Sequence, residues 1–546
     1  MNFNFEEKKQ MAVNFFRKYW IPIVGALIVL AVILSIINIY REEVLDIDSS
    51  ITYEKQDTIF IPANNIDTLN PITTITEDSY YINKLLYSSL FAFDENLGVE
   101  EELIKDYAID TEKAYIDITL KSGIKFHDGS ILSAHDVSFT IDAIKAFGSK
   151  GLYYNKANKI LTVNVENDNK LRIYFKNNYD CALDYLTFPI VSENQFGSIG
   201  EFLEAKDFLP VGTGQYKVKE YDSYKTLELE PNKSYFGEKA SNFISVQIVP
   251  NKNSLDNLIE NGTITCYLDK GSDRKSVVTN NNLKMYDIIS NEVDFIYFNT
   301  ASGFFKDKEM RKAVAYAIDS QEVLEKAYLN DGVLTDTLYY PNFLGVEDSL
   351  KSYIYDLDKS RLLLTKKGYK DEDSNGLLED KKGNEPELKI LVNSNNANRI
   401  AASKFISNNL KELGFKVTVE SLPWDEYQNA IKAKKFDILI TGYVIEESYD
   451  LRTFFDGKAP WGYMNQDLYE QVRKFDRLYE SDDYVKHYEK FKEMINEELP
   501  YYPLAYKKMG LIGTGTFEAK ELPMHNNIYK NIDTWNWSKI IKEEDN

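Results

Sequence analysis

Two histidines of the chain are followed directly by aspartate in LKSGIKFHDGSILSAHDVSFT, which runs from Leu120 to Thr140. The pairs are His127-Asp128 and His135-Asp136. A histidine beside a carboxylate can serve as a general base or as a metal ligand. Zinc sites need three or four ligands, and no third ligand lies close to these pairs in the sequence. The pairs therefore favour a structural role over an active site.

The pattern around the pairs indicates a strand, a turn and a helix. Residues 115–120 (YIDITL) alternate apolar and polar side chains, as a half-buried strand does. The HDG triplet that ends at Gly129 is typical of a turn. Ser133 is a suitable N-cap, and Asp136 stands at the position of a capping box. In this interpretation Asp136 stabilises a helix end, and His135 lies beside it in the first turn.

A second acidic motif could bind calcium. DEDSNG, from Asp371 to Gly376, has oxygen-bearing side chains at positions 1, 3 and 5 and glycine at position 6, as calcium loops do. Position 12 is Lys382, where a calcium loop carries a bidentate glutamate. We prefer a polar surface turn, and calcium binding remains the alternative.

Composition excludes several classes of protein. The chain has 546 residues, 43% hydrophobic and 27% charged, which predicts about three globular domains. Its net charge of -22 argues against nucleic acid as a partner. No serine-hydrolase, zinc-protease or nucleotide-binding motif occurs in a suitable context, so we expect neither an enzyme nor a cofactor.

The metal-ligating residues are too scattered to form a cluster in the sequence. The four histidines stand at positions 127, 135, 487 and 525, and we expect no tight nickel site made of protein ligands alone. The two cysteines, Cys181 and Cys266, do not form a metal-type motif. A disulfide between them is possible outside the cell, but we prefer two buried free thiols.

An apolar segment near the N-terminus predicts membrane attachment. As a helix, residues 20–40 span about 31 Å, the thickness of a bilayer core. Basic residues precede the segment and acidic residues follow it, which places residues 1–19 in the cytoplasm and the remainder outside. No small-residue cleavage site follows, so we expect an uncleaved transmembrane helix, with a cleaved signal peptide as the alternative. Residues 41–56 are predicted to form a linker.

The second half of the chain alternates strands and helices. We predict strands at 388–392, 415–420 and 436–440, and helices at 401–413 and 424–434. This β-α-β-α-β order is typical of a parallel sheet covered by helices. Asp307 is predicted to cap another helix, and strands predominate before residue 300. The expected fold class is α/β.

At this point several motifs resemble one family. LKSGIKFHDGSILSAHDVSFT closely resembles the signature of family 5 extracellular solute-binding proteins, the oligopeptide, dipeptide and nickel receptors of ABC importers. In VGTGQYKV, Gln215 replaces the usual proline of the family's GTGPY turn. The resemblance spans residues 58–540, and its other matching segments are DTLNP (67–71), LELEPNKSYF (227–236), FIYFNT (295–300), KDKEMRKAVAYAID (306–319), NNLKELGFKVTV (408–419) and INEELPYYPLAY (495–506).

The resemblance implies a Venus-flytrap receptor of the type II periplasmic-binding-protein class. Two main α/β lobes would close over a ligand, with a smaller side lobe, and here a transmembrane helix would precede them. Lobe I is expected to comprise residues 50–77, 205–297 and 505–546. Lobe II, the side lobe with both histidine–aspartate pairs, would comprise 78–204, and lobe III 298–504. The pairs would then mark the fold and not a reaction site.

The resemblance also implies a ligand site. Peptide receptors of this family hold the peptide α-ammonium with an acidic residue of lobe III, and ITGYVIEESYDLRTFF (440–455) places Glu447 there, with Leu451 at the usual proline. A carboxylate suits this role because a buried ammonium needs an opposite charge. The alternative is a solvated acidic loop. The other residues expected at the pocket are Glu446, Asp450, Tyr443, Trp424, Trp461, Tyr463 and Asn465.

By this resemblance, the expected function is solute capture for an ABC importer. The ligand would be an oligopeptide, passed by a monomeric receptor to a permease and its ATPases. A receptor that senses a ligand without transport, or one for a sugar or a metal chelate, remains an alternative. The side-chain preferences of the pocket cannot be read from the sequence.

Overall fold

The computed structural model describes residues 9–10, 13–14, 51–177, 182–205, 209–271, 274–281, 283–301, 303–347, 351–447, 449–475 and 481–542. The chain divides into two compact units, one of Met1–Gln56 with Ser538–Asn546 and one of Asp57–Trp537. The predicted membrane segment at 20–40 lies outside the described residues. Within the described ranges, no helix has the length and apolar character needed to cross a bilayer.

The smaller unit contains a two-stranded sheet that the sequence did not predict. Strand β1 (Ile51–Gln56) pairs with β19 (Trp537–Lys542), which begins at the last residue of the larger unit. The predicted linker at 41–56 is therefore partly a strand. Its sequence ITYEKQ is mostly polar, and the strand is defined by a partner near the other end of the chain, so no local pattern reveals it.

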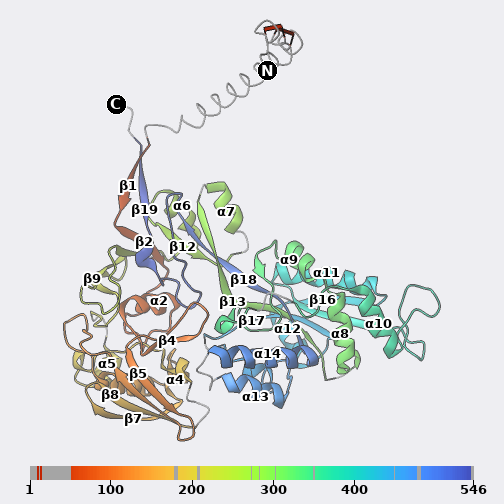
Figure 1. The fold of residues 1–546 in the computed structure, drawn as a ribbon, viewed down its shortest axis with the longest axis horizontal. Helices are drawn as coiled ribbons and strands as arrows, with labels where there is room; N and C mark the ends of the chain where they lie inside the picture. Colours follow the sequence, from red (N-terminus) through yellow and green to blue (C-terminus); the bar gives the residue numbers. More distant parts are fainter. Residues whose placement is uncertain are drawn as a thin grey trace, which may run out of the picture. The chain divides into compact units, whose positions relative to one another are not determined.

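A four-stranded sheet opens the larger unit (Figure 1). Its order is β2-β11-β10-β9, with β2 and β11 parallel and the other pairs antiparallel. The strands are β2 (Thr58–Ala63), β9 (Tyr216–Asp222), β10 (Thr226–Pro231) and β11 (Phe243–Ile248).

The histidine–aspartate pairs belong to a second, antiparallel sheet of order β5-β6-β8-β7 and the helix after it. The predicted strand at 115–120 is confirmed as β6, and the predicted capping box is confirmed at helix α3 (Ala134–Phe147). The other strands are β5 (Ile104–Asp110), β7 (Ile160–Asn167) and β8 (Lys170–Phe175), with the small β3 (Phe91–Phe93) and β4 (Val99–Glu101) pair nearby in sequence.

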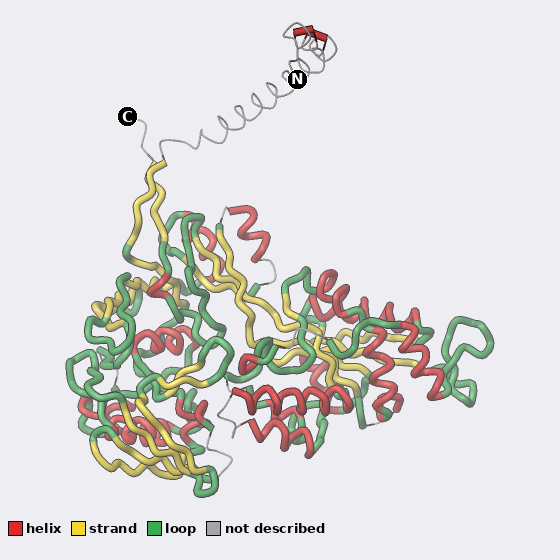
Figure 2. The backbone as a smooth tube through the Cα atoms, viewed as in Figure 1, coloured by secondary structure: helices red, strands yellow, loops and turns green. Residues whose placement is uncertain are grey.

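The third sheet has seven strands in the order β12-β18-β13-β17-β15-β16, with β14 paired to β18. In Figure 2 strands are yellow, and red helices run alongside the strands of this sheet. The predicted β-α-β-α-β run is confirmed, because β15 pairs in parallel with both β16 and β17. The strands are β12 (Cys266–Asp269), β13 (Lys284–Phe298), β14 (Gly332–Val333), β15 (Glu387–Asn393), β16 (Lys416–Leu422), β17 (Ile438–Val444) and β18 (Tyr501–Gly513).

Alternate residues of this sheet face two separate cores. On β13, Ile296 and Phe298 belong to one buried cluster, and Phe295 and Tyr297 belong to another. A strand places successive side chains on opposite faces, so both faces are covered, as expected of an α/β fold. A third and larger cluster fills the region of the two earlier sheets and includes residues of the 509–537 segment.

Helices complete the larger unit. Asp307 caps α8 through a bond from the Glu309 backbone N–H, as predicted. The α-helices not yet bounded are α2 (Glu77–Leu86), α4 (Tyr154–Ala157), α5 (Ile199–Glu204), α6 (Leu255–Glu260), α7 (Arg274–Asn281), α8 (Lys308–Ala317), α9 (Ser320–Ala327), α10 (Leu357–Lys367), α11 (Ala397–Glu412), α12 (Trp424–Lys432), α13 (Gln466–Lys474) and α14 (Ser481–Glu498).

Candidate functional site

Glu447 follows strand β17 and meets residues from two distant segments of the larger unit. Its Oε1 accepts hydrogen bonds from the Tyr80 hydroxyl and, at 3.3 Å, from Lys84 Nζ. Its Oε2 accepts a bond of 3.3 Å from Lys156 Nζ. The carboxylate is therefore shared by two ammonium groups and a phenol, the kind of charge-assisted network that is strong when shielded from water.

Helix α2 brings two of these partners to one face. Tyr80 and Lys84 are four residues apart, and side chains at this spacing are neighbours on a helix. Lys84 Nζ also lies 4.6 Å from the centre of the Tyr80 ring, within reach of a cation–π contact. The helix begins with Glu77 and Asp78 and has Lys84 near its end, which complements the helix dipole.

Lys156 reaches Glu447 from the short helix α4. Its Nζ also donates to Thr187 Oγ1 at 2.7 Å and lies 5.7 Å from the centre of the Phe93 ring. Lys156, Lys84 and Glu447 have side chains that are 16%, 23% and 22% exposed. These ion pairs are therefore largely shielded, and removal of one partner would leave charge uncompensated.

The lysines determine the ionisation of Glu447. Burial alone would raise the pKa of Glu447, but Lys84 and Lys156 outweigh burial and lower this pKa to about 2. Burial lowers the pKa of the Lys84 ammonium, and Glu447 opposes that shift. Glu447 is thus a fixed negative charge at neutral pH.

A cavity of about 470 Å³ lies beside this cluster, and we call it the Glu447 cavity. It is lined by residues of the segments 75–81, 152–156, 444–447 and 525–526, and by Asn291. Its walls combine tyrosine rings with charged groups, a composition typical of small-molecule sites. Burial lowers the pKa of His525 in this wall to about 4, so the ring is neutral at pH 7.

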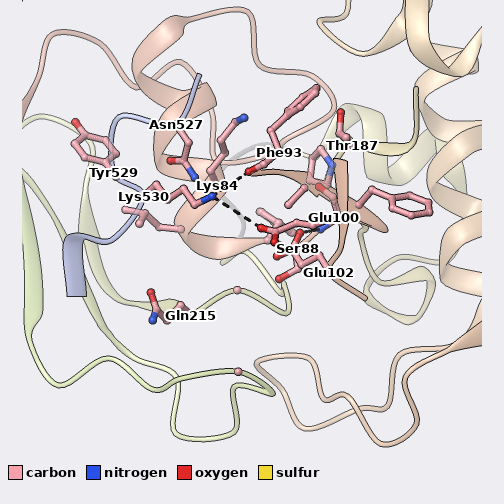
Figure 3. A pocket seen from close by; sticks show the side chains of 18 of the residues that line it. Lys84, Ser88, Phe93, Glu100, Glu102, Thr187, Gln215, Asn527, Tyr529 and Lys530 are labelled. Carbon is pink, nitrogen blue, oxygen red and sulfur yellow. Dashed lines mark hydrogen bonds and ion pairs between the residues drawn. The ribbon is translucent and has the colours of Figure 1, made fainter. Parts of the chain in front are cut away.

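A second cavity of about 490 Å³, which we call the α2 cavity, is shown in Figure 3. It shares Tyr153 and Asn526 with the Glu447 cavity. Lys84, Glu102 and Lys530 are among its lining residues. Lys530 Nζ donates to the Phe93 carbonyl at 3.0 Å and lies 3.9 Å from Glu100. Lys84 lines the α2 cavity, whereas Glu447 and Lys156 line the Glu447 cavity. The ion pairs of Glu447 therefore connect the walls of the two cavities.

The wall of the α2 cavity also includes polar groups that are largely shielded from water. Burial raises the pKa of the Glu102 carboxyl to about 7, although the Ser89 backbone N–H donates to it at 2.8 Å. Asn83 is only 1% exposed, and among the described residues neither its amide nitrogen nor its amide oxygen has a hydrogen-bond partner. A buried amide without a partner is unfavourable, so this wall has unused hydrogen-bonding capacity.

Only part of the expected pocket comes together. Glu447 and Glu446 line the Glu447 cavity, and Glu446 is exposed. Asp450 instead pairs with Arg452 at 2.7 Å, and Tyr443 packs against Phe454 with ring centres 4.9 Å apart. Neither Asp450 nor Tyr443 lines either cavity.

The remaining expected residues have structural positions. Trp424 is 51% exposed at the start of α12, and Asn465 is the N-cap of α13. Trp461 and Tyr463 are buried in an aromatic core around Tyr501, and the Trp461 indole donates to the Tyr501 hydroxyl at 2.9 Å. Their apolar surface is therefore used for packing and not for the wall of either cavity.

Four residues of the site were missed from the sequence, namely Tyr80, Lys84, Tyr153 and Lys156. No helix was predicted at residues 77–86; with one, the spacing of Tyr80 and Lys84 could have indicated a shared face. Nothing local indicates that this face meets Glu447, which is 363 residues from Lys84.

The histidine–aspartate pairs have structural roles. Gly212 N–H donates to His127 Nδ1 at 3.3 Å, and His127 Nε2 donates to the Gly214 carbonyl at 3.2 Å. His135 lies in the first turn of α3, where its backbone N–H bonds to Ser133 Oγ at 3.2 Å. These contacts agree with the interpretation as fold elements.

The structure also bears on the acidic loop at residues 371–376 and on the two cysteines. Asp371, Asp373 and Glu379 bring carboxylate oxygens within 4.8 Å of one another, so calcium binding at this loop is still an alternative. Cys266 is a buried free thiol, and burial raises its pKa. Cys181 lies outside the described residues.

Comparison with known proteins gives one family match and a consistent fold. The model of the bacterial extracellular solute-binding proteins, family 5 middle region, matches residues 98–460. The oligopeptide-binding protein AppA of Bacillus subtilis is 25% identical over 85% of this chain and 89% of the relative.

Two solved structures are similar in fold. The unliganded open form of the periplasmic murein tripeptide binding protein MppA gives a TM-score of 0.74 at 14% identity, over 90% of this chain and 99% of that chain. NikZ of Campylobacter jejuni in complex with Ni(L-His) gives a TM-score of 0.62 at 22% identity, over 88% of this chain and 99% of that chain. These likenesses identify the fold as an α/β fold of the periplasmic-binding-protein type.

Proposed function

Because this chain belongs to the family 5 bacterial extracellular solute-binding proteins, we propose that it captures a short peptide in the Glu447 cavity for an ABC importer. The observation that carries the proposal is a cavity of about 470 Å³ at the one acidic residue that the family resemblance selected. A cavity of this size, with tyrosine rings and charged groups in its walls, suits a small ligand. The importer's permease and ATPases would be its partners.

The peptide assignment is supported by the relative named for oligopeptide binding, which spans most of this chain. Main-chain groups of a peptide can pair with protein backbone, which gives affinity without strong sequence preference. The Ni(L-His) complex of NikZ makes a metal chelate the second candidate ligand.

We propose that the chain from residue 50 onward works as a closing trap. Lobe I would comprise 50–77, 205–297 and 505–546, lobe II 78–204 and lobe III 298–504. The Glu447 cavity takes its walls from all three of these proposed parts. A ligand would stabilise the closed form only by its differential affinity for closed over open. The receptor would act as a monomer.

We also propose that residues 20–40 anchor the receptor in the membrane, with residues 1–19 in the cytoplasm. The apolar length and the flanking charges support this proposal. N-terminal sequencing of protein extracted from membranes tests it: the uncleaved chain should begin near Met1. A mature N-terminus near residue 41 would show that the segment is a cleaved signal.

Binding to the full chain in detergent tests the ligand class. We expect a random tetrapeptide library to raise the unfolding temperature in a concentration-dependent way, because a ligand that binds only the folded state stabilises it. Maltotriose and a nickel–histidine complex are the comparison ligands. Stabilisation by either of these, without any effect of peptides, would contradict the peptide assignment and leave only the solute-receptor family.

Transport and sensing can be separated in cells. If the receptor serves an importer, deletion of its gene should reduce uptake of labelled peptides, and a plasmid copy should restore it. Unchanged uptake in the deletion strain would favour a sensing role.

A further inference from the structure

Glu447 is already paired with two ammonium groups of the protein itself. Each oxygen of Glu447 accepts a bond from a lysine of the same chain, Lys84 on Oε1 and Lys156 on Oε2, both at 3.3 Å. Oε1 also accepts from the Tyr80 hydroxyl. A carboxylate with three such donors offers little remaining capacity to a ligand ammonium.

A ligand ammonium at this position would also be repelled. It would have to lie beside two lysine ammonium groups that are each within bonding distance of the same carboxylate. Like charges in a shielded site destabilise each other strongly. The arrangement therefore disfavours the role that the family resemblance implied for Glu447.

The same arrangement favours an anionic group. Lys84 and Lys156 are two positive charges in contact with one negative charge, and each ammonium has three donors. Lys156 lines the Glu447 cavity, and its ammonium donates to Glu447 and Thr187, which leaves one N–H for a ligand in that cavity.

The surrounding charges offset the two lysines only in part. Glu77 is paired with Lys270 at 2.8 Å, Glu446 is exposed, and burial keeps His525 neutral. Burial raises the pKa of Glu102 to about 7 and that of Asp184 to about 6. At pH 7 Glu102 is therefore about half ionised, whereas Asp184 stays mostly ionised near Lys156 and Arg452.

We propose that the Glu447 cavity binds the carboxylate end of its ligand, with Lys156 as the direct partner and Lys84 as the second cation. Glu447 is then a positioning residue that holds both lysines in place. The inference rests on the proposed function, since it assigns a polarity to a peptide in that cavity. It predicts that the ligand needs a free C-terminus and does not need a free N-terminus.

Four terminal forms of one peptide library test this polarity on the unaltered full chain. The library contains tetrapeptides of Gly, Ala, Ser, Leu and Tyr, with free ends, an acetylated N-terminus, an amidated C-terminus, or both ends blocked. Calorimetry should show affinity within about threefold after acetylation and at least tenfold lower after amidation. A fifth library, amidated but containing one glutamate, reveals whether a side-chain carboxylate can substitute.

The outcomes separate this inference from the proposed function. Loss of binding on acetylation, with no effect of amidation, would overturn the inference and leave peptide capture intact. If none of the libraries binds, both the inference and the peptide assignment fail. Recovery of affinity in the glutamate library would support carboxylate recognition.

Matched variants identify the residue responsible. Lys156→Gln should lower affinity for the free-acid library at least tenfold and remove the preference over the amide, and Lys156→Arg should restore both. The control is Lys113→Gln, which alters an exposed lysine paired with Asp110 and should change neither the affinity nor the preference for the free acid.

Glu447→Gln should retain measurable binding and the preference for the free acid. Loss of all binding in a folded Glu447→Gln protein, with Lys156→Gln unaffected, would contradict the assignment.

Discussion

At the scale of single residues, His127 connects the family signature to the candidate site. Its ring accepts from Gly212 and donates to Gly214, and the Gly214 N–H donates to the Leu86 carbonyl at the end of α2. A Cβ at either glycine would collide with backbone of residues 85 and 86, so this approach requires glycine. The histidine thus helps to hold the helix that carries Tyr80 and Lys84.

We predict that His127 makes the protein less stable in acid. Burial lowers the pKa of His127 to about 4, below the value of about 6.5 expected for the unfolded chain. Its stabilising contribution is present above pH 6.5 and is lost as pH falls towards 4, because the unfolded chain binds the proton first. Between pH 7 and 5 the loss should be about 2 kcal/mol.

Urea unfolding of wild type and His127→Gln at pH 7 and pH 5 measures this effect. The variant should be less stable at pH 7, and its stability should decline less on acidification, by about 2 kcal/mol. His525 is present in both proteins, so its own titration cancels in the comparison. Equal declines would show that His127 does not titrate as described.

At the scale of elements, predictions succeeded where one segment carries the whole signal. The capping box at Ser133 and the β15-α11-β16-α12-β17 run were predictable because periodicity and caps are local. Helix α11 begins at Ala397, four residues before the predicted start, because Asn396 provides the cap. Strand β1 was not predictable, since its partner β19 lies near the other end of the chain.

Strand β17 also depends on a contact that no local pattern shows. Gly442 lies against the buried pair of Asp294 and Arg399, which are joined by a bond of 2.7 Å. Asp294 is fully buried and also accepts from the Tyr328 hydroxyl at 3.0 Å. The absence of a side chain at Gly442 is what allows this ion pair to lie under the strand that leads to Glu447.

We predict that Gly442→Ala destabilises the fold by about 3 kcal/mol or more, because a Cβ would displace a buried ion pair. Gly200→Ala is the control: Gly200 lies in α5 with its nearest neighbouring atom 3.9 Å from a Cβ position, so alanine should be neutral or slightly stabilising. Urea unfolding compares the two variants. Similar stability of both would show that β17 accommodates the methyl group.

At the scale of the whole molecule, the site joins segments that the sequence keeps far apart. Family resemblance led to Glu447, but the two lysines came only from the structure, since they lie 363 and 291 residues away. Ordinary lysines on helices carry no signal of their partners. The aromatic residues expected at the pocket show a related difficulty, because Trp461 and Tyr463 lie in a buried cluster and their residue types suit a core equally well.

The Lys84–Glu447 pair should therefore couple distant segments more strongly than a surface pair does. In a double-mutant cycle with Lys84→Met and Glu447→Gln, we expect a coupling energy of about 1–2 kcal/mol, because both side chains are mostly shielded. The matched control is Lys270–Glu77, which also joins α2 to a distant segment but has side chains 52% and 59% exposed. Its coupling should be below about 0.5 kcal/mol.

Unfolding is measured without ligand, in low salt and in 1 M NaCl, a concentration at which the Debye length falls to about 3 Å. Salt should abolish the control coupling and leave most of the Lys84–Glu447 coupling. Equal couplings, or equal salt sensitivity, would show that Glu447 is solvated and that its lysines are not fixed in the folded protein.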